Sequence, residues 1–455
     1  MNEKFSEREL TYQMLLQVIR EEKPSHVILF QALETYGWLD RKSRAFISRL
    51  FRGVLENDLQ LRFVIGCVSS VPVRKMKTPV RVILEMGVFQ ILYMDHVPDR
   101  AACNEAVSLA KRHGLTRLSG FVNAVLRAVS AKKKELEYPD PGKDPVSFLR
   151  DRYSLPAWIG SVWIRRFGYE KTLAMAQAAL ADHPLTVRIR RESGRAGILE
   201  DLAAAGAGVQ EGRFMPCALR LTLPCAPDRL LPLQDGRLAV QDESAMLSAV
   251  CADPHPGDHV IDVCAAPGGK SIQLSDIMGG KGLVSARDIS PAKVAMIEEN
   301  LARMGGSCVQ AMCMDALQRC PEDVGTADVV MADLPCSGLG VMGRKPDIKL
   351  SMNEDKIHQL AELQRQILAV VSSYVKPGGT LLYSTCTVSL QENEENAAWL
   401  CSHFPFHMES LNPFLPEMLR SREAESGSLQ ILPGQYGSDG FFLARLIRDR
   451  EEESR

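Results

Sequence analysis

The chain of 455 residues lacks any run of about 18 or more consecutive apolar residues, the minimum for a membrane-spanning helix. Its first ten residues, MNEKFSEREL, are too polar to form the apolar core of a secretion signal. The sequence therefore predicts neither a membrane segment nor export. We expect a cytoplasmic protein with no membrane partner.

Cysteine pairs at short spacing are also missing. The 12 cysteines include no C-x-x-C pair, and the 9 histidines are scattered along the chain. Closely spaced cysteines and histidines are the usual signature of a zinc site, so we expect no metal. Thiols stay reduced in the cytoplasm, which argues against a disulfide framework. Individual cysteines are therefore expected either to fill the core or to carry chemistry.

Positive and negative side chains are nearly equal in number, with 54 lysines and arginines and 56 aspartates and glutamates. The formal net charge is −2, so the chain as a whole does not attract nucleic acid, and any RNA contact needs local basic patches. The 45% hydrophobic and 24% charged content is that of a globular protein. A chain of this length exceeds one ordinary core, which predicts two or three domains.

The first part of the chain has the spacing of helices only. Apolar residues recur at helical intervals from Ser6 to about Glu137, and Ser6 with Glu9 forms a capping-box pattern. Prolines at 139, 141 and 145 follow, and they predict a linker without helix. We assign residues 1–137 to an all-α domain whose short turns favour packing as a bundle.

Residues 146–240 mix helical and alternating patterns and predict a small α+β linking subdomain. Two helices are expected at 156–167 and 170–181, and a strand at 185–190. Arg188, Arg190 and Arg191 give this subdomain cationic charge that could face an RNA backbone.

From residue 241 to 447 predicted strands alternate with helices, which is typical of a parallel sheet with helices on both faces. Ser389 and Glu392 repeat the capping-box pattern before the last helix. The fold class is therefore α/β, with a Rossmann-like domain at the end of the chain. Its strands are expected at 259–263, 282–287, 308–312, 327–332 and 380–383, with a closing antiparallel pair at 406–409 and 441–446.

A glycine-rich turn, DVCAAPGGK at 262–270, follows the first of these strands and precedes a helical pattern. Ligands of such sheets bind at the carboxyl ends of the strands. The turn is neither G-x-G-x-x-G nor a complete G-x-x-x-x-G-K-[ST] loop, so dinucleotides and nucleoside triphosphates lack support. Acidic residues follow the next three strands, namely Asp288, Asp315 and Asp333. S-adenosylmethionine, a nucleoside with a sulfonium and no phosphate, suits a site rich in carboxylates.

Two cysteines stand just beyond later strands, Cys336 in DLPC and Cys386 in STCT. A thiolate that adds to C6 of cytosine makes C5 nucleophilic enough to take a methyl group, which is a form of covalent catalysis. The alternative is that both are small buried hydrophobes, as single cysteines often are. That alternative does not explain why both end sheet strands, one of them beside Asp333.

Several stretches resemble known families. The first 135 residues or so resemble the NusB-like RNA-binding domain, on NEAV at 104–107 and GFVNAVLR at 120–127. The last part resembles the Sun/NOL1/NOP2 family of RNA cytosine-C5 methyltransferases. The matching stretches are DVCAAPGGK at 262–270, DLPCSG at 333–338, RKPDIK at 344–349, YSTCT at 383–387 and DGFF at 439–442.

The resemblance implies a class I methyltransferase that transfers a methyl group from S-adenosyl-L-methionine to cytosine C5 in small-subunit (16S) rRNA. It implies that Cys386 is the nucleophile and that Cys336 assists release of the methylated base. We expect a monomer, although the sequence itself does not define the oligomeric state. The residues that would hold the cofactor are Cys264, Ala265, Ala266, Pro267, Gly268, Gly269, Lys270, Asp288, Asp315 and Asp333.

Three positions depart from the family pattern. Arg287 stands where an apolar strand residue is usual, Leu334 replaces a common alanine, and Gly343 stands where a basic residue is frequent. None of these removes a catalytic group, although Gly343 weakens the expectation of RNA contacts from its loop.

Alternatives stay open at this point. DNA cytosine methyltransferases use the cysteine of the Pro-Cys pair, which makes Cys336 the rival nucleophile. The chain could also be an RNA-binding assembly factor with an inactive methyltransferase domain, or an enzyme that acts on tRNA.

Overall fold

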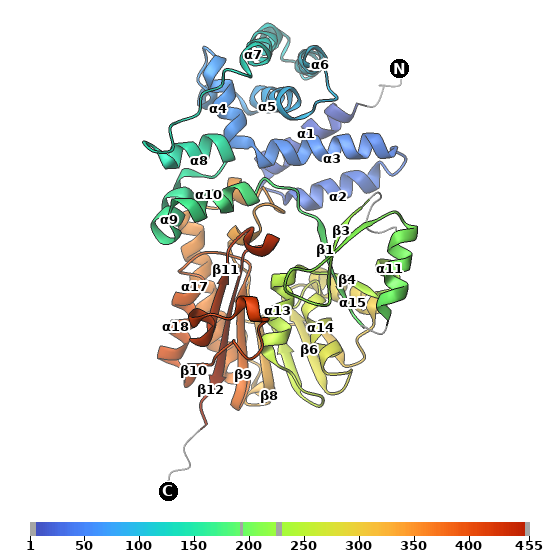
Figure 1. The fold of residues 1–455 in the computed structure, drawn as a ribbon, viewed down its shortest axis with the longest axis vertical. Coiled ribbons are helices and arrows are strands. Elements are labelled where there is room, and N and C mark those ends of the chain that lie inside the picture. The colour runs from blue at the N-terminus through green and yellow to red at the C-terminus, as the bar shows by residue number, and fades with distance from the viewer. Residues whose placement is uncertain (1–5, 192–193, 224–229, 451–455) are drawn as a thin grey trace. The chain divides into compact units, whose positions relative to one another are not determined.

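A computed structural model of the chain describes residues 6–191, 194–223 and 230–450 (Figure 1). These residues form two compact units. The first comprises Met1–Ala181 together with Met342–Ser351, and the second comprises Asp182–Val341 and Met352–Arg455. Within the described ranges, no helix combines the length and the apolar character that crossing a bilayer requires.

The first unit is all-helical. Helix α5 is its centre, because eleven of its residues are buried. Gly53 of α3 lets Phe89 of α5 approach closely: a Cβ atom at Gly53 would lie 1.9 Å from the Phe89 ring. The α-helices of this unit are α1 (Glu7–Glu21), α2 (Ser25–Thr35), α3 (Arg41–Glu56), α4 (Asp58–Val68), α5 (Thr78–Tyr93), α6 (Asp99–Arg112), α7 (Ser119–Lys132), α8 (Pro145–Tyr153), α9 (Ala157–Phe167), α10 (Tyr169–Ala178) and α16 (Ile348–Ser351).

The predicted linker is free of helix from 138 to 144, but helix α8 begins at Pro145, which was expected to exclude a helix. Pro145 is the first residue of the helix, where a missing N–H costs nothing and the fixed φ of proline suits the first turn. Asp144 precedes it, and its carboxylate accepts a hydrogen bond from the Ser147 N–H at 3.0 Å. The proline that seemed to exclude a helix therefore starts one.

A ten-residue segment from the later part of the chain, Met342–Ser351, belongs to this helical unit. Ser25 donates a hydrogen bond to Asp347, and the Lys349 ammonium donates to the Glu56 carbonyl at 3.2 Å. Lys349 is buried, and burial lowers its pKa to about 8 although Glu56 and Asp58 oppose the shift. The RKPDIK motif thus anchors this segment in the helical unit.

A four-stranded antiparallel sheet in the order β2-β3-β1-β4 forms the first part of the second unit. Its strands are β1 (Leu185–Ile189), β2 (Gly208–Glu211), β3 (Ala218–Thr222) and β4 (Leu238–Val240), and the helices α11 (Arg195–Ala204) and α12 (Leu231–Gln234) accompany them. Val187 and Leu219 of the sheet pack with Ile198 and Leu202 of α11 in one small core.

Two arginines of this sheet are not available to an RNA backbone, which corrects one expectation. Arg188 and Arg190 both bind the carboxylate of Asp276, at 2.9 Å and 2.6 Å, and both are nearly buried. Asp276 lies on α14 (Gly269–Ile277), the helix that follows the glycine-rich turn. These cations therefore tie the small sheet to the helix that supports the predicted cofactor turn.

The main sheet has eight strands, in the order β10-β12-β9-β8-β5-β6-β7 with β11 pairing to β12. Strands β5 to β9 are parallel, and β12 runs antiparallel to β9. The seven strands predicted in this part are confirmed. The strands are β5 (His259–Asp262), β6 (Leu283–Asp288), β7 (Val309–Cys313), β8 (Ala327–Asp333), β9 (Val375–Thr385), β10 (Phe406–Met408), β11 (Ser428–Ile431) and β12 (Phe441–Arg448).

Both faces of this sheet are covered, because successive residues of each buried strand enter different cores. Val329 packs with α13 (Glu243–Ala252) and α14 on one face, whereas Val330 packs with α17 (Glu354–Val371) and α18 (Glu394–His403) on the other (Figure 1). The remaining α-helices of this unit are α15 (Pro291–Met304) and α19 (Arg422–Glu425).

The expected capping box at the last predicted helix does not form. Helix α18 begins at Glu394, and no side chain caps it. Ser389 accepts a long hydrogen bond from the Glu392 N–H at 3.4 Å, two residues before the helix begins, and the Glu392 carboxylate binds Ser337. Helix α13 and strands β2 and β11 were not predicted at all.

Arg287, the unusual residue in strand β6, has a buried partner. Its guanidinium binds the carboxylate of Asp323 through two hydrogen bonds of 2.6 Å and 3.0 Å. Burial would raise the pKa of Asp323, but the hydrogen bonds and the charge of Arg287 outweigh it and lower that pKa. An arginine is tolerated inside this strand because its charge is matched at once.

We predict that Asp323→Asn lowers the free energy of unfolding at pH 7 by about 3 kcal/mol, because it leaves the Arg287 charge buried without a counter-charge. The folded Asp323 has a lowered pKa, so its stabilisation is complete above the unfolded pKa of roughly 4 and is lost as the pH falls through the folded value. Urea denaturation at several pH values measures this. The difference in the free energy of unfolding between the wild type and Asp323→Asn should become smaller below about pH 4. A difference that does not change with pH would contradict the prediction.

Candidate active site

The neighbouring parallel strands β8 and β9 bring the two predicted catalytic turns together. Their pairing ends at Asp333 and Ser384. At the end of this pairing the Ser384 side chain donates to Asp333 at 2.8 Å. Farther along the two chains, the hydroxyls of Ser337 and Thr387 lie 2.7 Å apart. The two chains therefore stay side by side past the edge of the sheet.

Cys336 and Cys386 lie between these contacts, with their sulfur atoms 3.3 Å apart. This separation is a hydrogen bond between two thiols, far longer than a disulfide. Both residues are half-buried. The hydrogen bond with Cys386, reinforced by burial, raises the pKa of Cys336 well above its ordinary value. Cys336 is therefore held as a protonated thiol beside Cys386.

Lys270 reaches the same end of the sheet from the start of α14. Its ammonium binds the second oxygen of Asp333 at 2.7 Å and lies 5.7 Å from the centre of the Phe441 ring. Burial would lower the pKa of Lys270, but Asp333 in first place, then Asp262 and the charge of Cys386, raise it. A permanent cation thus stands near the thiol of Cys386.

The glycine-rich turn runs from Cys264 to Lys270 between β5 and α14. Gly268 adopts φ +97°, a conformation that few side chains tolerate, and the space around Gly269 is open. No side chain caps this helix start, and the first N–H groups of a helix have no partner within the helix itself. Burial, with the charges of Asp262 and Asp288, raises the pKa of the Cys264 thiol, which therefore stays protonated.

The three acidic residues fall in different places. Asp288 accepts a hydrogen bond from the Ala266 N–H at 3.1 Å and binds Lys293 at 3.0 Å, so it touches the turn. Asp333 joins it through Lys270. The Asp315 carboxylate accepts from the Leu317 N–H at 3.0 Å within its own turn. The structure thus brings Asp288 and Asp333 to the glycine-rich turn, while the role of Asp315 stays a prediction.

Sequence reasoning missed the residues that hold the loop before β12. Asp242, at the start of α13, accepts from the Ser438 hydroxyl at 2.6 Å. Two residues later, Gly440 donates to the Gly340 carbonyl at 2.9 Å, and the Gly340 N–H donates to the Cys386 carbonyl at 3.0 Å. Asp242 in a helix-cap pattern before an apolar run was the available signal.

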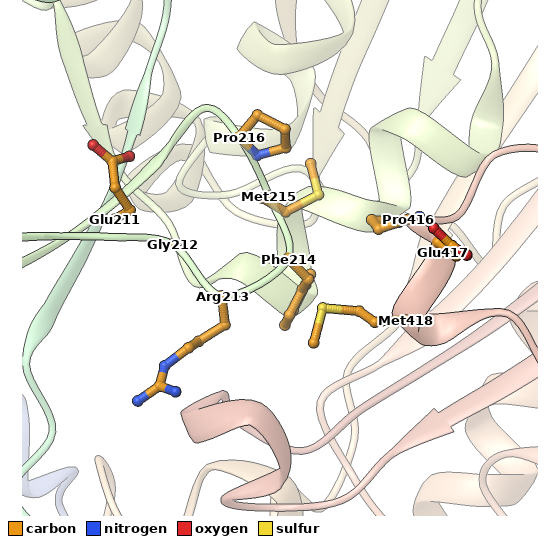
Figure 2. Close-up of a pocket in the computed structure, with 9 residues that line it drawn as sticks. All are labelled: Glu211, Gly212, Arg213, Phe214, Met215, Pro216, Pro416, Glu417 and Met418. Carbon is orange, nitrogen blue, oxygen red and sulfur yellow. The ribbon is translucent and has the colours of Figure 1, made fainter.

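The next residue, Glu243, anchors a second loop. Its carboxylate is buried and accepts from the backbone N–H groups of Arg213, Phe214 and Met215 at 2.9–3.0 Å. This loop forms one wall of an open pocket of about 640 Å³, whose other wall is Pro416, Glu417 and Met418 (Figure 2). Figure 2 shows the Arg213 side chain directed away from the sulfur-bearing and aromatic residues. None of the predicted site residues lines this pocket.

These features fit a nucleoside cofactor that carries no phosphate. The open space at Gly269 leaves room for a ligand that a Cβ atom would obstruct, and the uncapped helix start offers N–H donors. The carboxylates of Asp288 and Asp333 can accept from hydroxyl or amino groups. The residues present therefore suit S-adenosylmethionine better than a pyrophosphate.

Comparison with known families covers nearly the whole chain. The family model described as "16S rRNA methyltransferase RsmB/F" matches residues 249–447, and the "NusB family" model matches residues 6–131. A third model, "Methyltr_RsmF/B-like, ferredoxin-like domain", matches residues 155–228.

Curated relatives decide the family. The "Probable ribosomal RNA small subunit methyltransferase B" of Bacillus subtilis is 34% identical over 448 residues, which cover 97% of this chain and 99% of the relative. This chain belongs to the ribosomal RNA small subunit methyltransferase B family. The protein of the same description from Synechocystis is 30% identical and covers 97% of this chain and 99% of its own. The resemblance inferred from the motifs is thereby confirmed, and S-adenosylmethionine is the methyl donor of this family.

Solved structures agree on the fold. The crystal structure of PH0851 matches 98% of this chain and 100% of its own, with a TM-score of 0.78 and 25% identity. NSun6 from Pyrococcus horikoshii matches 64% of this chain and 97% of its own, with a TM-score of 0.56 and 20% identity, and this likeness shows the fold alone. The predicted fold class, a NusB-like helical part, a small α+β part and a methyltransferase part, is confirmed.

We predict that Gly340→Ala disrupts the arrangement of the two cysteine turns. A Cβ atom there would lie 2.2 Å from the Gly440 carbonyl oxygen and 2.7 Å from that of Cys386, so the backbone must move. Thermal unfolding should show a loss of about 1–3 kcal/mol, and methyl transfer to rRNA should fall at least about a hundredfold.

Gly66→Ala is the matched control, because the space around Gly66 is open and it lies within α4. Full activity of Gly340→Ala would show that the close approach of the two loops is unimportant.

Proposed function

We propose that this protein transfers a methyl group from S-adenosyl-L-methionine to C5 of a cytosine in small-subunit rRNA, through a covalent bond between Cys386 and C6. The observation that carries the proposal is the 3.3 Å approach of the two thiols at the ends of adjacent strands, next to the Lys270–Asp333 pair. Two cysteines so placed fit an attack and a release on one base, as the family resemblance implies.

Cys386 is the better candidate for the nucleophile. The pKa of Cys336 is raised well above its usual value, so Cys336 carries a proton when the reaction begins. The charges of Lys270 and Cys386 favour each other, because the thiolate of Cys386 contributes to the raised pKa of Lys270. A thiolate attacks, whereas a protonated thiol cannot.

The proposed chemistry balances in three steps. The Cys386 thiolate forms a bond to C6, and the ring electrons move to C5. S-adenosylmethionine, when bound, would supply the methyl group that C5 takes; its S–CH3 bond breaks, and the electron pair of that bond stays on the cofactor sulfur, which becomes a neutral thioether. A base then removes the C5 proton, the electron pair restores the ring double bond, and the bond between sulfur and C6 breaks. Cys336 lies 3.3 Å from the departing sulfur and is placed to assist this last step.

The residues proposed to hold the cofactor are the turn from Cys264 to Lys270, with Asp288, Asp315 and Asp333. Asp288 suits the ribose hydroxyls because it follows the second strand, and Asp315, after the third, suits the adenine amine. Asp333 is proposed to serve twice, since it faces Lys270 and could also accept from the cytosine amino group. The target base has to leave its stack to reach these groups.

We predict that Cys386→Ala abolishes the covalent complex with an RNA that contains 5-fluorocytosine, whereas Cys336→Ala still forms it. With unmodified substrate RNA, Cys336→Ala should accumulate a complex that survives a denaturing gel, because the base is not released. The opposite pattern would make Cys336 the nucleophile.

Absence of any complex with the wild-type protein would support the rival reading, an RNA-binding factor without activity. Bisulfite sequencing of small-subunit rRNA from cells with and without the gene identifies the substrate, and an unchanged rRNA pattern would favour tRNA.

We predict that Gly269→Ala weakens S-adenosylmethionine binding at least about tenfold without loss of stability, because no protein atom meets the added Cβ. Isothermal titration measures the affinity and thermal unfolding the stability. Gly120→Ala, also in open space, is the control and should bind normally. Unchanged affinity of Gly269→Ala would place the cofactor elsewhere.

A further inference from the structure

Two adjacent buried residues, Glu392 and Asn393, each contact one of the two cysteine turns. Both side chains are fully buried, and they lie in the turn that precedes α18. Neither caps that helix, although the sequence pattern suggests a cap. Burying a carboxylate and an amide costs free energy unless their hydrogen bonds are made, so their partners indicate what they do.

Glu392 holds the turn of Cys336. Its carboxylate accepts from the Ser337 N–H at 2.8 Å and from the Ser337 hydroxyl at 2.5 Å. Since that hydroxyl has one proton, the contact between Ser337 and Thr387 is donated by Thr387. The residue after Cys336 is thereby bound through both its backbone and its side chain.

Gln364 of α17 completes this support on the other side of Cys336. Its amide group donates to the Pro335 carbonyl at 2.9 Å and to Glu392 at 3.2 Å. Asn396 donates to the oxygen of this amide at 2.8 Å, and the Tyr383 hydroxyl shares its single proton between the same oxygen, at 3.1 Å, and the Glu392 carbonyl. Both neighbours of Cys336 in the chain are thus tied to one buried polar network.

Asn393 holds the turn of Cys386 in the same manner. Its oxygen accepts from the Thr385 hydroxyl at 2.6 Å, and its amide donates to the Thr387 carbonyl at 3.1 Å. The amide also donates to Gln430 at 2.8 Å, and Gln430 donates to the Thr387 carbonyl at 3.3 Å. The residues before and after Cys386 are therefore bound to a second buried group.

We propose that Glu392 and Asn393 are positioning residues with separate tasks: Glu392 orients Cys336 for release of the base, and Asn393 orients Cys386 for attack on it. The inference rests on the proposed function, since it assigns the two contacts to the two steps of that reaction. The side chains of Glu392 and Asn393 bind Ser337, Thr385 and Thr387, which are the chain neighbours of the two cysteines. Because Glu392 and Asn393 are consecutive, a single turn of the chain would fix the orientation of both thiols.

The test uses Glu392→Gln, which replaces one carboxylate oxygen by an amino group, and Asn393→Asp, which replaces the amino group of the amide by an oxygen. Glu392→Gln removes one acceptor of the Ser337 turn. It should slow turnover at least about tenfold and accumulate the covalent complex on unmodified RNA, while trapping by 5-fluorocytosine RNA stays near normal. Asn393→Asp removes the donors to Thr387 and Gln430. It should slow trapping at least about tenfold and accumulate no complex on unmodified RNA.

Asn57→Asp is the matched control, because it makes the same exchange at a buried amide of the helical unit that donates to a backbone carbonyl. It should leave both readouts unchanged. If either test variant does not fold, Ser337→Ala and Thr385→Val remove the same contacts from the other side and should give the same two phenotypes.

Cys336→Ala and Cys386→Ala, measured in parallel, separate this inference from the proposed function. If Cys336→Ala accumulates complex on unmodified RNA and Glu392→Gln does not, the task assigned to Glu392 is wrong. If both Glu392→Gln and Asn393→Asp slow trapping alike, the division of tasks is wrong. If the two cysteine variants themselves fail to show attack and release defects, the proposed function fails first.

Discussion

The parallel pairing of β8 with β9 is the constraint on which the candidate site depends. Strands that run side by side deliver their carboxyl ends to the same edge, so residues that follow them in matching positions must meet. Here the match extends beyond the ladder to the sulfur atoms of Cys336 and Cys386. The small sheet, the antiparallel strand β12 and the helices around it support this edge without supplying a thiol.

Polar contacts around this edge of the sheet explain how the two cysteine turns keep one geometry. Asp242 and Glu243 bind loops on one side, and Glu392 and Asn393 bind the cysteine turns themselves. Glu243, Glu392 and Asn393 are buried with hydrogen bonds made, which favours a single arrangement over several. Lys270 and Asp333 provide the charged part of the same surface.

Much of the fold and part of the site followed from sequence patterns. Apolar runs placed the main strands, and the order of their turns brought Cys336 and Cys386 to one edge. What failed depended on partners distant in the chain. A capping box describes local bonds only, so it could not show that Glu392 binds Ser337, 55 residues earlier. Arg188 and Arg190 looked like surface cations because a sequence does not reveal Asp276 as their counter-charge.

The segment Met342–Ser351 has a consequence for how the protein can be divided. The chain leaves the second unit after Val341, shortly past Cys336, contributes Lys349 to the helical unit, and returns to the second unit at Met352. A fragment that begins after residue 181 would keep this segment but lose its partners in the helical unit, Ser25 for Asp347 and Glu56 for Lys349. The backbone thus passes between the two units more than once, so neither unit can be separated from the other by cutting a single peptide bond.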